Sequence, residues 1–191
     1  TLAAARRFAD VTASDYVPAL LEKCRRRAAA EGLTIRIEPA DVEALPFADG
    51  SFDVVLSTFG AMFAPDQEQT AREMLRVVRS GVRIGMANWT PEGFIGRLFK
   101  LIGGRLPPPA GLKSPALWGT ESRIVELFGN GAEEIRCVRR HFNFRYRSAA
   151  HWLQIFGDYY GPTHKAFAAL DDAARAGLEA DIAALLDELN V

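Results

Sequence analysis

The chain is poor in the residues that metal sites, disulfides and membranes require. Its 191 residues include only two cysteines and three histidines. Cys24 and Cys137 lie far apart and show no metal-ligand spacing, so we expect free thiols in a reducing, cytoplasmic compartment and no metal site. A run of about 18 apolar residues is also lacking, so the sequence predicts no membrane-spanning helix.

Neither sign of charge is in excess. The chain has 23 basic and 24 acidic side chains, a net charge of −1, which gives no electrostatic basis for binding nucleic acid. It also lacks the Asn/Asp-Pro-Pro-Tyr/Phe motif that holds a flipped base. With 49% apolar and 25% charged residues, the composition is that of one ordinary globular domain.

The stretch over residues 34–60 organises the rest of the chain. Residues 34–38 alternate between polar and apolar side chains, and residues 52–57 form a short β-branched and aromatic run after a turn; both patterns predict strands. Asp41 follows the first strand, and Ser57 to Gly60 follow the second. Ligands of parallel sheets bind beyond the carboxyl ends of the strands, so these positions are candidate binding residues.

The remaining pattern of the first half predicts an α/β, doubly wound sheet. A helix feeding a buried parallel strand implies an earlier strand, so we expect residues upstream of Thr1. The segments that complete the pattern are helices at 1–9, 16–31 and 67–79 and strands at 10–15 and 82–89.

The second half predicts mainly helices. Thr120 has the chemistry of an N-cap, and residues 134–147 alternate as a long, bent strand whose phase slips near Arg139. Glycine and proline predict a loop at 103–111 and a break at 157–162. The expected helices span 94–102, 120–128, 148–156 and 165–189.

Three segments together resemble the class I S-adenosylmethionine-dependent methyltransferases, in the small-molecule branch of the ubiquinone and menaquinone methyltransferases. They are VTASDYVPALLEKCRRRAAAEGL, ADVEALPFADGSFDVVLSTFG and LRVVRSGVRIGMANW. The resemblance implies a Rossmann-like, mostly parallel sheet with helices on both faces and S-adenosyl-L-methionine as cofactor. It also implies one domain over residues 1–191, with a cofactor-binding core at 1–90 and a helical cap or substrate region at 91–130 and 147–191.

The resemblance implies that Asp15 binds the ribose hydroxyls and that Asp41 binds the adenine amino group, with the Val42 N–H bonding the ring. Simpler interpretations remain: Asp15 as a helix cap, Asp41 as a turn residue, and Phe59 and Phe63 as core. The full set of expected cofactor-binding residues is Asp15, Tyr16, Asp41, Val42, Glu43, Thr58, Phe59 and Gly60.

The sequence departs from the family pattern in four places. The glycine-rich loop is expected before Thr1, and the last strand of the sheet has no candidate before Val191. Ala13-Ser14 precedes the first acid, where the family usually has a single small residue or glycine. Ser80-Gly81-Val82 replaces the usual Pro-Gly-Gly turn.

The expected reaction is methyl transfer to a small, aromatic or apolar metabolite by in-line displacement, which depends on positioning more than on a fixed set of catalytic residues. His151, Asp158 and Tyr160 are the leading candidates for a general base. Two alternatives stay open: a non-catalytic, adenosyl-ligand-binding or regulatory member of the fold, and an NAD-type oxidoreductase. The oligomeric state cannot be read from the chain, and a homodimer is left open. An apolar acceptor wall is expected from Trp89, Phe94, Leu117 and Trp118, for which core packing is an equal explanation.

Overall fold

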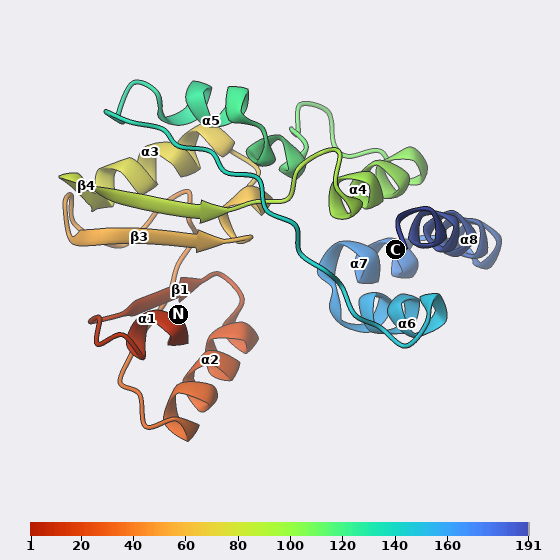
Figure 1. Ribbon diagram of the computed structural model, residues 1–191, viewed down its shortest axis with the longest axis horizontal. Coiled ribbons are helices and arrows are strands. Elements are labelled where there is room, and N and C mark those ends of the chain that lie inside the picture. Colours follow the sequence, from red (N-terminus) through yellow and green to blue (C-terminus); the bar gives the residue numbers. More distant parts are fainter. Residues whose placement is uncertain (191) are drawn as a thin grey trace. The chain divides into compact units, whose positions relative to one another are not determined.

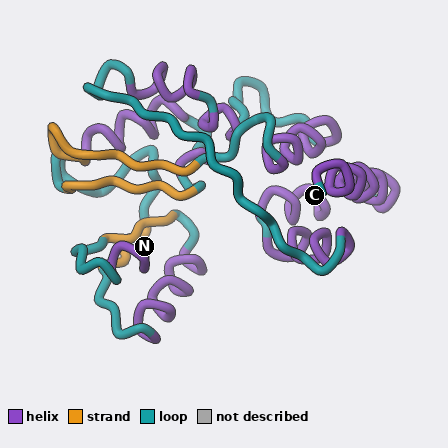
Figure 2. The backbone as a smooth tube through the Cα atoms, in the orientation of Figure 1, coloured by secondary structure: helices purple, strands orange, loops and turns teal. Residues whose placement is uncertain are grey.

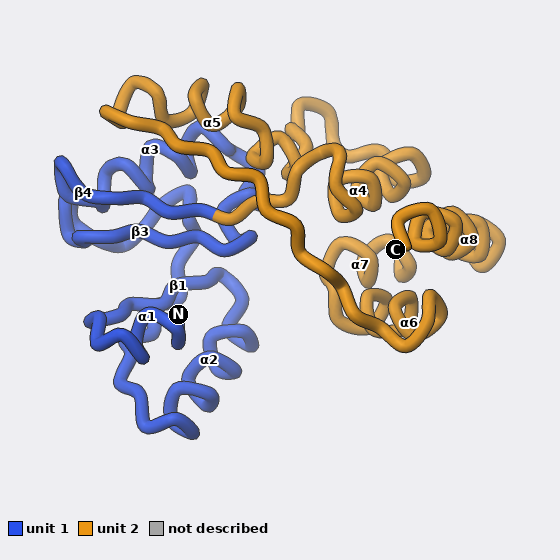
Figure 3. The backbone as a smooth tube through the Cα atoms, in the orientation of Figure 1, with its two compact units in different colours: residues 1–86 blue, residues 87–191 orange. Residues whose placement is uncertain are grey.

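The computed structural model describes residues 1–190 and divides the chain into two compact units, Thr1–Met86 and Ala87–Val191 (Figure 3). Each unit is described by itself. Among the described residues, none of the helices has the length and hydrophobicity needed to span a bilayer.

The first unit alternates helices with short strands (Figure 1). Strand β1 ends at Asp15 and strand β2 at Pro39, and the two are parallel, with Asp15 opposite Pro39. Helix α2 joins them and packs on both strands through its buried Leu21 and Ala28. The elements are α1 Leu2–Ala5, β1 Thr12–Asp15, α2 Pro18–Ala30, β2 Arg36–Pro39, β3 Phe52–Thr58, η1 Ala61–Phe63, α3 Gln67–Val77 and β4 Val78–Ala87.

The second strand pair of this unit is β3 with β4, joined by α3. The two arrows point the same way in Figure 1, as expected for strands linked by a crossover helix. The sequence-based prediction of an α/β fold with parallel strands is therefore confirmed. The strands described here form two separate pairs, β1–β2 and β3–β4, and not one continuous sheet.

Three element boundaries in the first unit differ from expectation. The first helix is a single turn, Leu2–Ala5, because so short an isolated helix is marginal and Phe8 takes a left-handed φ of 63°. Helix α3 stops at Val77, and the chain becomes extended at Val78, where β-branched side chains favour a strand. Gly81, expected to end the helix, instead lies inside β4 with a φ of 75°.

Four helices of the second unit surround one apolar cluster. Side chains cap three of the helices as their sequences indicate: Thr120 accepts from the Arg123 N–H, Ser148 from that of His151, and Asp171 from that of Ala174. The elements are α4 Phe94–Arg105, η2 Pro115–Gly119, α5 Glu121–Phe128, α6 Ala149–Tyr159, α7 Gly161–Ala169 and α8 Asp172–Leu189. The buried cluster comprises Ile95, Leu98, Trp152, Phe156, Ala166, Phe167, Leu178 and Ile182.

Three expectations for the second unit are wrong. Helix α4 continues through Gly103 and Gly104 because it packs along α8 and its Arg105 forms an ion pair with Asp181 at 2.7 Å. Helix α6 continues through Gly157, where the absence of a side chain lets the ring of Phe167 approach closely. Residues 134–147 form no strand, and Figure 2 shows this segment as loop.

Two glycines lie against the backbone of the turn at residues 89–91. A Cβ atom on Gly96 would lie 2.2 Å from the Thr90 carbonyl oxygen, and one on Gly119 would lie 2.3 Å from the Trp89 carbonyl oxygen. Neither distance is sterically allowed, so both positions require glycine for the observed packing.

We predict that Leu178→Ala lowers the free energy of unfolding by about 2–5 kcal/mol, because Leu178 is fully buried in the cluster of the second unit. Leu189→Ala, at the 41% exposed end of the same helix, should change it by less than about 0.5 kcal/mol. Urea unfolding of both variants measures the difference. Equal effects would contradict the position of α8 in this core.

Candidate functional site

Two acidic residues lie at neighbouring strand ends in the first unit. Asp15 is the last residue of β1, and its carbonyl oxygen accepts a hydrogen bond from the Ala40 N–H at 3.1 Å. Asp41 therefore follows directly after the last bond between β1 and β2. The parallel register thus places Asp15 and Asp41, which are 26 positions apart in the sequence, at the same end of this strand pair.

The Asp15 carboxylate has one oxygen committed to its own turn. Its Oδ1 atom accepts from the Val17 N–H at 2.9 Å, so it stabilises the turn that precedes α2. In the part of the chain that the structure describes, its second oxygen has no hydrogen-bond partner. The turn-forming role and a ligand-binding role are therefore compatible. Tyr16, which lies between Asp15 and Val17 in this turn, is 72% exposed.

Asp41 repeats this arrangement after β2. Its Oδ1 atom accepts from the Glu43 N–H at 2.9 Å, and the turn is closed by the Ala44 N–H bonding to the Asp41 carbonyl at 3.1 Å. The exposed second oxygen and the Val42 N–H have no partner among residues 1–190. The Glu43 carboxylate is bonded away from this turn, because its Oε1 atom accepts from the Asp66 N–H at 2.7 Å.

The end of β3 carries a strained residue. Phe59 has a φ of 59°, a left-handed conformation that costs an ordinary residue about 1–2 kcal/mol. The Ser57 hydroxyl oxygen accepts from the Ala61 N–H at 2.9 Å and holds the turn in place. Thr58 and Gly60 on either side are exposed. Strain of this kind is concentrated at binding and catalytic sites, which makes this strand end a candidate site segment.

These groups fit the nucleoside part of S-adenosylmethionine. A ribose offers two hydroxyl donors, and a carboxylate oxygen such as the open one of Asp15 accepts hydroxyl hydrogens. Adenine offers an amino donor and a ring-nitrogen acceptor, which match the open Asp41 oxygen and the Val42 N–H. The open donors and acceptors thus have the chemistry that the nucleoside requires.

A partly buried ion pair anchors the loop that follows Asp41. Arg76 and Glu73 of α3 form two bonds with each other, both at 2.7 Å. The Arg76 guanidinium also donates to the carbonyl oxygens of Leu45 and Phe47, and Glu73 accepts from the Leu45 N–H at 2.7 Å. The Arg76 guanidinium, with help from the Leu45 N–H, lowers the pKa of the Glu73 carboxyl below its usual range.

The candidate bases of the second unit are in different environments. Burial raises the pKa of the Tyr160 hydroxyl above its usual range, and this hydroxyl lacks a hydrogen-bond partner among the described residues. Tyr160 therefore stays protonated at neutral pH. The His151 Nδ1 atom accepts from the Arg147 N–H at 3.3 Å, which leaves Nε2 as the protonated nitrogen.

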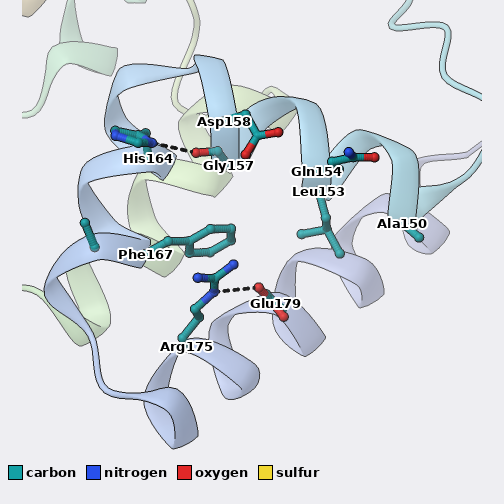
Figure 4. A pocket seen from close by; sticks show the side chains of 10 residues that line it. Ala150, Leu153, Gln154, Gly157, Asp158, His164, Phe167, Arg175 and Glu179 are labelled. Carbon is teal, nitrogen blue, oxygen red and sulfur yellow. Dashed lines mark hydrogen bonds and ion pairs between the residues drawn. The ribbon is translucent and has the colours of Figure 1, made fainter.

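Asp158 lies on an open groove of about 530 Å³ formed by α6, α7 and α8 (Figure 4). Figure 4 shows Arg175 over the Phe167 ring, at 4.8 Å, and bonded to Glu179 at 2.9 Å. The His164 Nδ1 atom lies 2.9 Å from the Gly157 carbonyl oxygen. Asp158 is exposed on this groove and has no hydrogen-bond or ion-pair partner within the described chain, so it is the most accessible of the three predicted bases.

Aromatic side chains gather near Trp89 in the second unit. Phe144 lies between Trp89 and Phe94, with ring centroids at 5.7 and 5.8 Å, and Phe94 packs edge-on against Trp152 at 5.1 Å. Trp118, which was expected to line an acceptor pocket, is 1% exposed and packs against Phe128. Phe144 belongs to this group although its segment forms no strand, so its role could not be anticipated from the expected strand.

Sequence reasoning missed the Glu73–Arg76 anchor. An i, i+3 pair of opposite charges on a helix is usually an exposed surface pair. The signal available was the position of Glu73 among the buried residues of α3, but the sequence does not show which loop it contacts.

Comparisons with known proteins agree on one family. A family model described as a methyltransferase domain matches residues 1–85. An uncharacterized protein of Mycobacterium tuberculosis is 41% identical over 192 residues, which cover 98% of this chain and 70% of that protein. The demethylmenaquinone methyltransferase of Deinococcus radiodurans is 31% identical over 156 residues, or 80% of this chain and 65% of that enzyme.

Two solved structures share the fold. The YcgJ protein from Bacillus subtilis has a TM-score of 0.61 and 20% identity, with 88% of this chain and 71% of that chain covered. A geranyl diphosphate methyltransferase in complex with GPP and sinefungin has a TM-score of 0.55 and 15% identity, with 98% and 62% covered.

We predict that Glu73→Gln makes the free energy of unfolding fall less steeply as the pH is lowered. The folded pKa of Glu73 is lowered, so its contribution is complete above the unfolded pKa of about 4.3 and is lost as pH falls through the folded value. Urea unfolding from about pH 2 to about pH 7, well below and well above the unfolded pKa, measures the effect. A fall with pH as steep as that of the wild type would contradict it.

Proposed function

Because the chain belongs to the class I S-adenosylmethionine-dependent methyltransferases, we propose that it methylates a small, aromatic or apolar metabolite by in-line displacement. S-adenosyl-L-methionine is the cofactor of this family. The observation that carries the proposal is the pair of carboxylates at the ends of β1 and β2, each with one oxygen bound to its own turn and one open.

We assign the nucleoside to these strand ends. Asp15 would accept hydrogen bonds from the ribose hydroxyls, with Tyr16 beside it. Asp41 would accept from the adenine amino group, and the Val42 N–H would donate to the ring. Glu43 contributes through position, because its carboxylate is bonded to the Asp66 N–H. The turn at Thr58, Phe59 and Gly60 is proposed to border the methionine part, where an aromatic face suits a sulfonium cation.

When bound, S-adenosylmethionine supplies an electrophilic methyl group, whose bond to sulfur breaks as the bond to the acceptor forms. The chain's contribution is then to hold the acceptor in line and to exclude water. Where the acceptor must lose a proton, Asp158 is the candidate base, because its carboxylate is exposed and unpaired among the described residues. Tyr160 stays protonated, and His151 would first have to exchange its bond to the Arg147 N–H.

The aromatic group around Trp89 supports an acceptor with an aromatic or apolar body. Trp89, Phe94 and Phe144 offer ring faces and edges, which suit planar apolar ligands. The name of the Deinococcus relative, a demethylmenaquinone methyltransferase, is consistent with such an acceptor. Free thiols at Cys24 and Cys137 support the proposed cytoplasmic location.

We predict that the protein binds S-adenosylhomocysteine and that Asp41→Ala weakens binding at least about tenfold, the effect of losing a hydrogen bond to a charged group. Isothermal titration calorimetry with the wild type and the variant measures both affinities. The product is used because it binds the same site without reacting.

Asp53→Ala is the matched control. Asp53 is an exposed acid of β3 paired with Arg79 on the surface, and its loss should leave the affinity unchanged. A folded wild-type protein without affinity for S-adenosylhomocysteine would overturn the proposed function, and equal losses in both variants would overturn the assignment of Asp41.

A further inference from the structure

One face of α3 is used entirely to hold the segment after Asp41. Gln69, Glu73 and Arg76 are spaced four and three residues apart, so they share a face of the helix. Each of them bonds to the segment over residues 43–50. We call Gln69, Glu73 and Arg76 the α3 clamp.

The N-terminal end of the clamp holds Glu43 twice. The Gln69 side-chain amide donates to the Glu43 carbonyl oxygen at 2.9 Å, and the Glu43 carboxylate accepts from the Asp66 N–H at 2.7 Å. Both the main chain and the side chain of Glu43 are therefore fixed to the start of α3. Glu43 in turn donates its N–H to Asp41, so Asp41 is one hydrogen bond away from the clamp.

The C-terminal end of the clamp holds the rest of the segment. Glu73 accepts from the Leu45 N–H, and Arg76 donates to the Leu45 and Phe47 carbonyl oxygens at 2.9 and 2.7 Å. Arg76 also pairs with Asp49 at 2.8 Å, and its carbonyl oxygen accepts from the Gly50 N–H at 2.9 Å. Every bond in this set runs between the helix and the segment.

The segment has almost no regular structure of its own. Its one ladder contact among the described residues is the bridge between Asp41 and Ala44. A loop without a ladder takes its position from the groups it is bonded to. Here these are on α3, apart from Arg79 of β4, which donates to the Gly50 carbonyl oxygen at 3.2 Å. The main chain of Asp41 is held beside β1 by the Ala40 N–H bond, but the turn beyond it depends mainly on a helix that carries none of the proposed cofactor contacts.

We infer that the α3 clamp consists of positioning residues for the adenosine-binding turn at 41–43, an inference that rests on the proposed function. The clamp fixes the open Asp41 oxygen and the Val42 N–H before a ligand arrives, which lowers the ordering cost of binding. Weakening the clamp should therefore reduce the affinity for the nucleoside without unfolding the chain.

The test uses Gln69→Met in the full chain. Methionine has a similar length and is a good helix former, so α3 is kept while the donor to Glu43 is removed. We expect the affinity for adenosine and for S-adenosylhomocysteine to fall by the same factor, about fivefold, as for one net hydrogen bond. Calorimetry measures both, at a temperature where the variant is folded by circular dichroism.

Arg72→Met is the matched control. Arg72 lies on the same helix and bonds to the Gln69 side-chain oxygen at 2.8 Å, but it makes no hydrogen bond to the segment. The affinity of this variant for adenosine and for S-adenosylhomocysteine should equal that of the wild type. At the other end of the clamp, Glu73→Gln keeps an oxygen that can accept from the Leu45 N–H, so it should retain more affinity than Glu73→Ala.

Hydrogen exchange of the unliganded chain separates this inference from the proposed function. Amides of residues 43–50 should exchange faster in Gln69→Met and Glu73→Ala, while those of α2 are unchanged. If the variants exchange faster but the wild type binds neither adenosine nor S-adenosylhomocysteine, the α3 clamp does position the segment and the proposed function is wrong. Wild-type exchange rates in both variants, or wild-type affinity in Gln69→Met, would overturn the inference.

Discussion

The bidentate bond between Glu73 and Arg76 is the interaction on which the first unit depends most. A carboxylate that is 11% exposed needs a partner, and the Arg76 guanidinium supplies it while its remaining donors bond to main-chain carbonyl oxygens. The Glu73–Arg76 pair therefore supplies hydrogen-bond partners to main-chain groups of a loop that lies outside any β-sheet. The strand ends are in register through β1 and β2, and the loop beyond them is in place through α3.

Much of this unit could be predicted from the sequence, because its signals are local. The alternation at residues 34–38, the apolar run at 52–57 and the stop at Gly32 each depend on neighbouring residues, and β2, β3 and α2 lie where expected. The side-chain cap at Thr120 is also local and is confirmed. The pairing of Asp15 with the end of β2 followed from topology, since parallel strands end at the same edge.

The failures lie where distant contacts decide the outcome. Residues 134–147 alternate as a strand does, but a strand needs a partner to complete its ladder, and in the chain as described none pairs with it. Gly103 and Gly104 disfavour a helix by about 1 kcal/mol each, and the packing of α4 on α8 offsets this cost. The contact of Glu73 with the loop could not be predicted for the same reason, because its partner Leu45 lies 28 residues earlier in the chain.

The glycine contacts around residues 89–91 bear on how such a protein can diverge. With Gly96 on one side and Gly119 on the other, the main chain of this turn is in contact with two Cα atoms and leaves no volume for a methyl group. A side chain at either position fits only if the turn moves away. The two glycines therefore hold the main chain of the turn from both sides, and variation in this part of the unit is confined to the side chains around it.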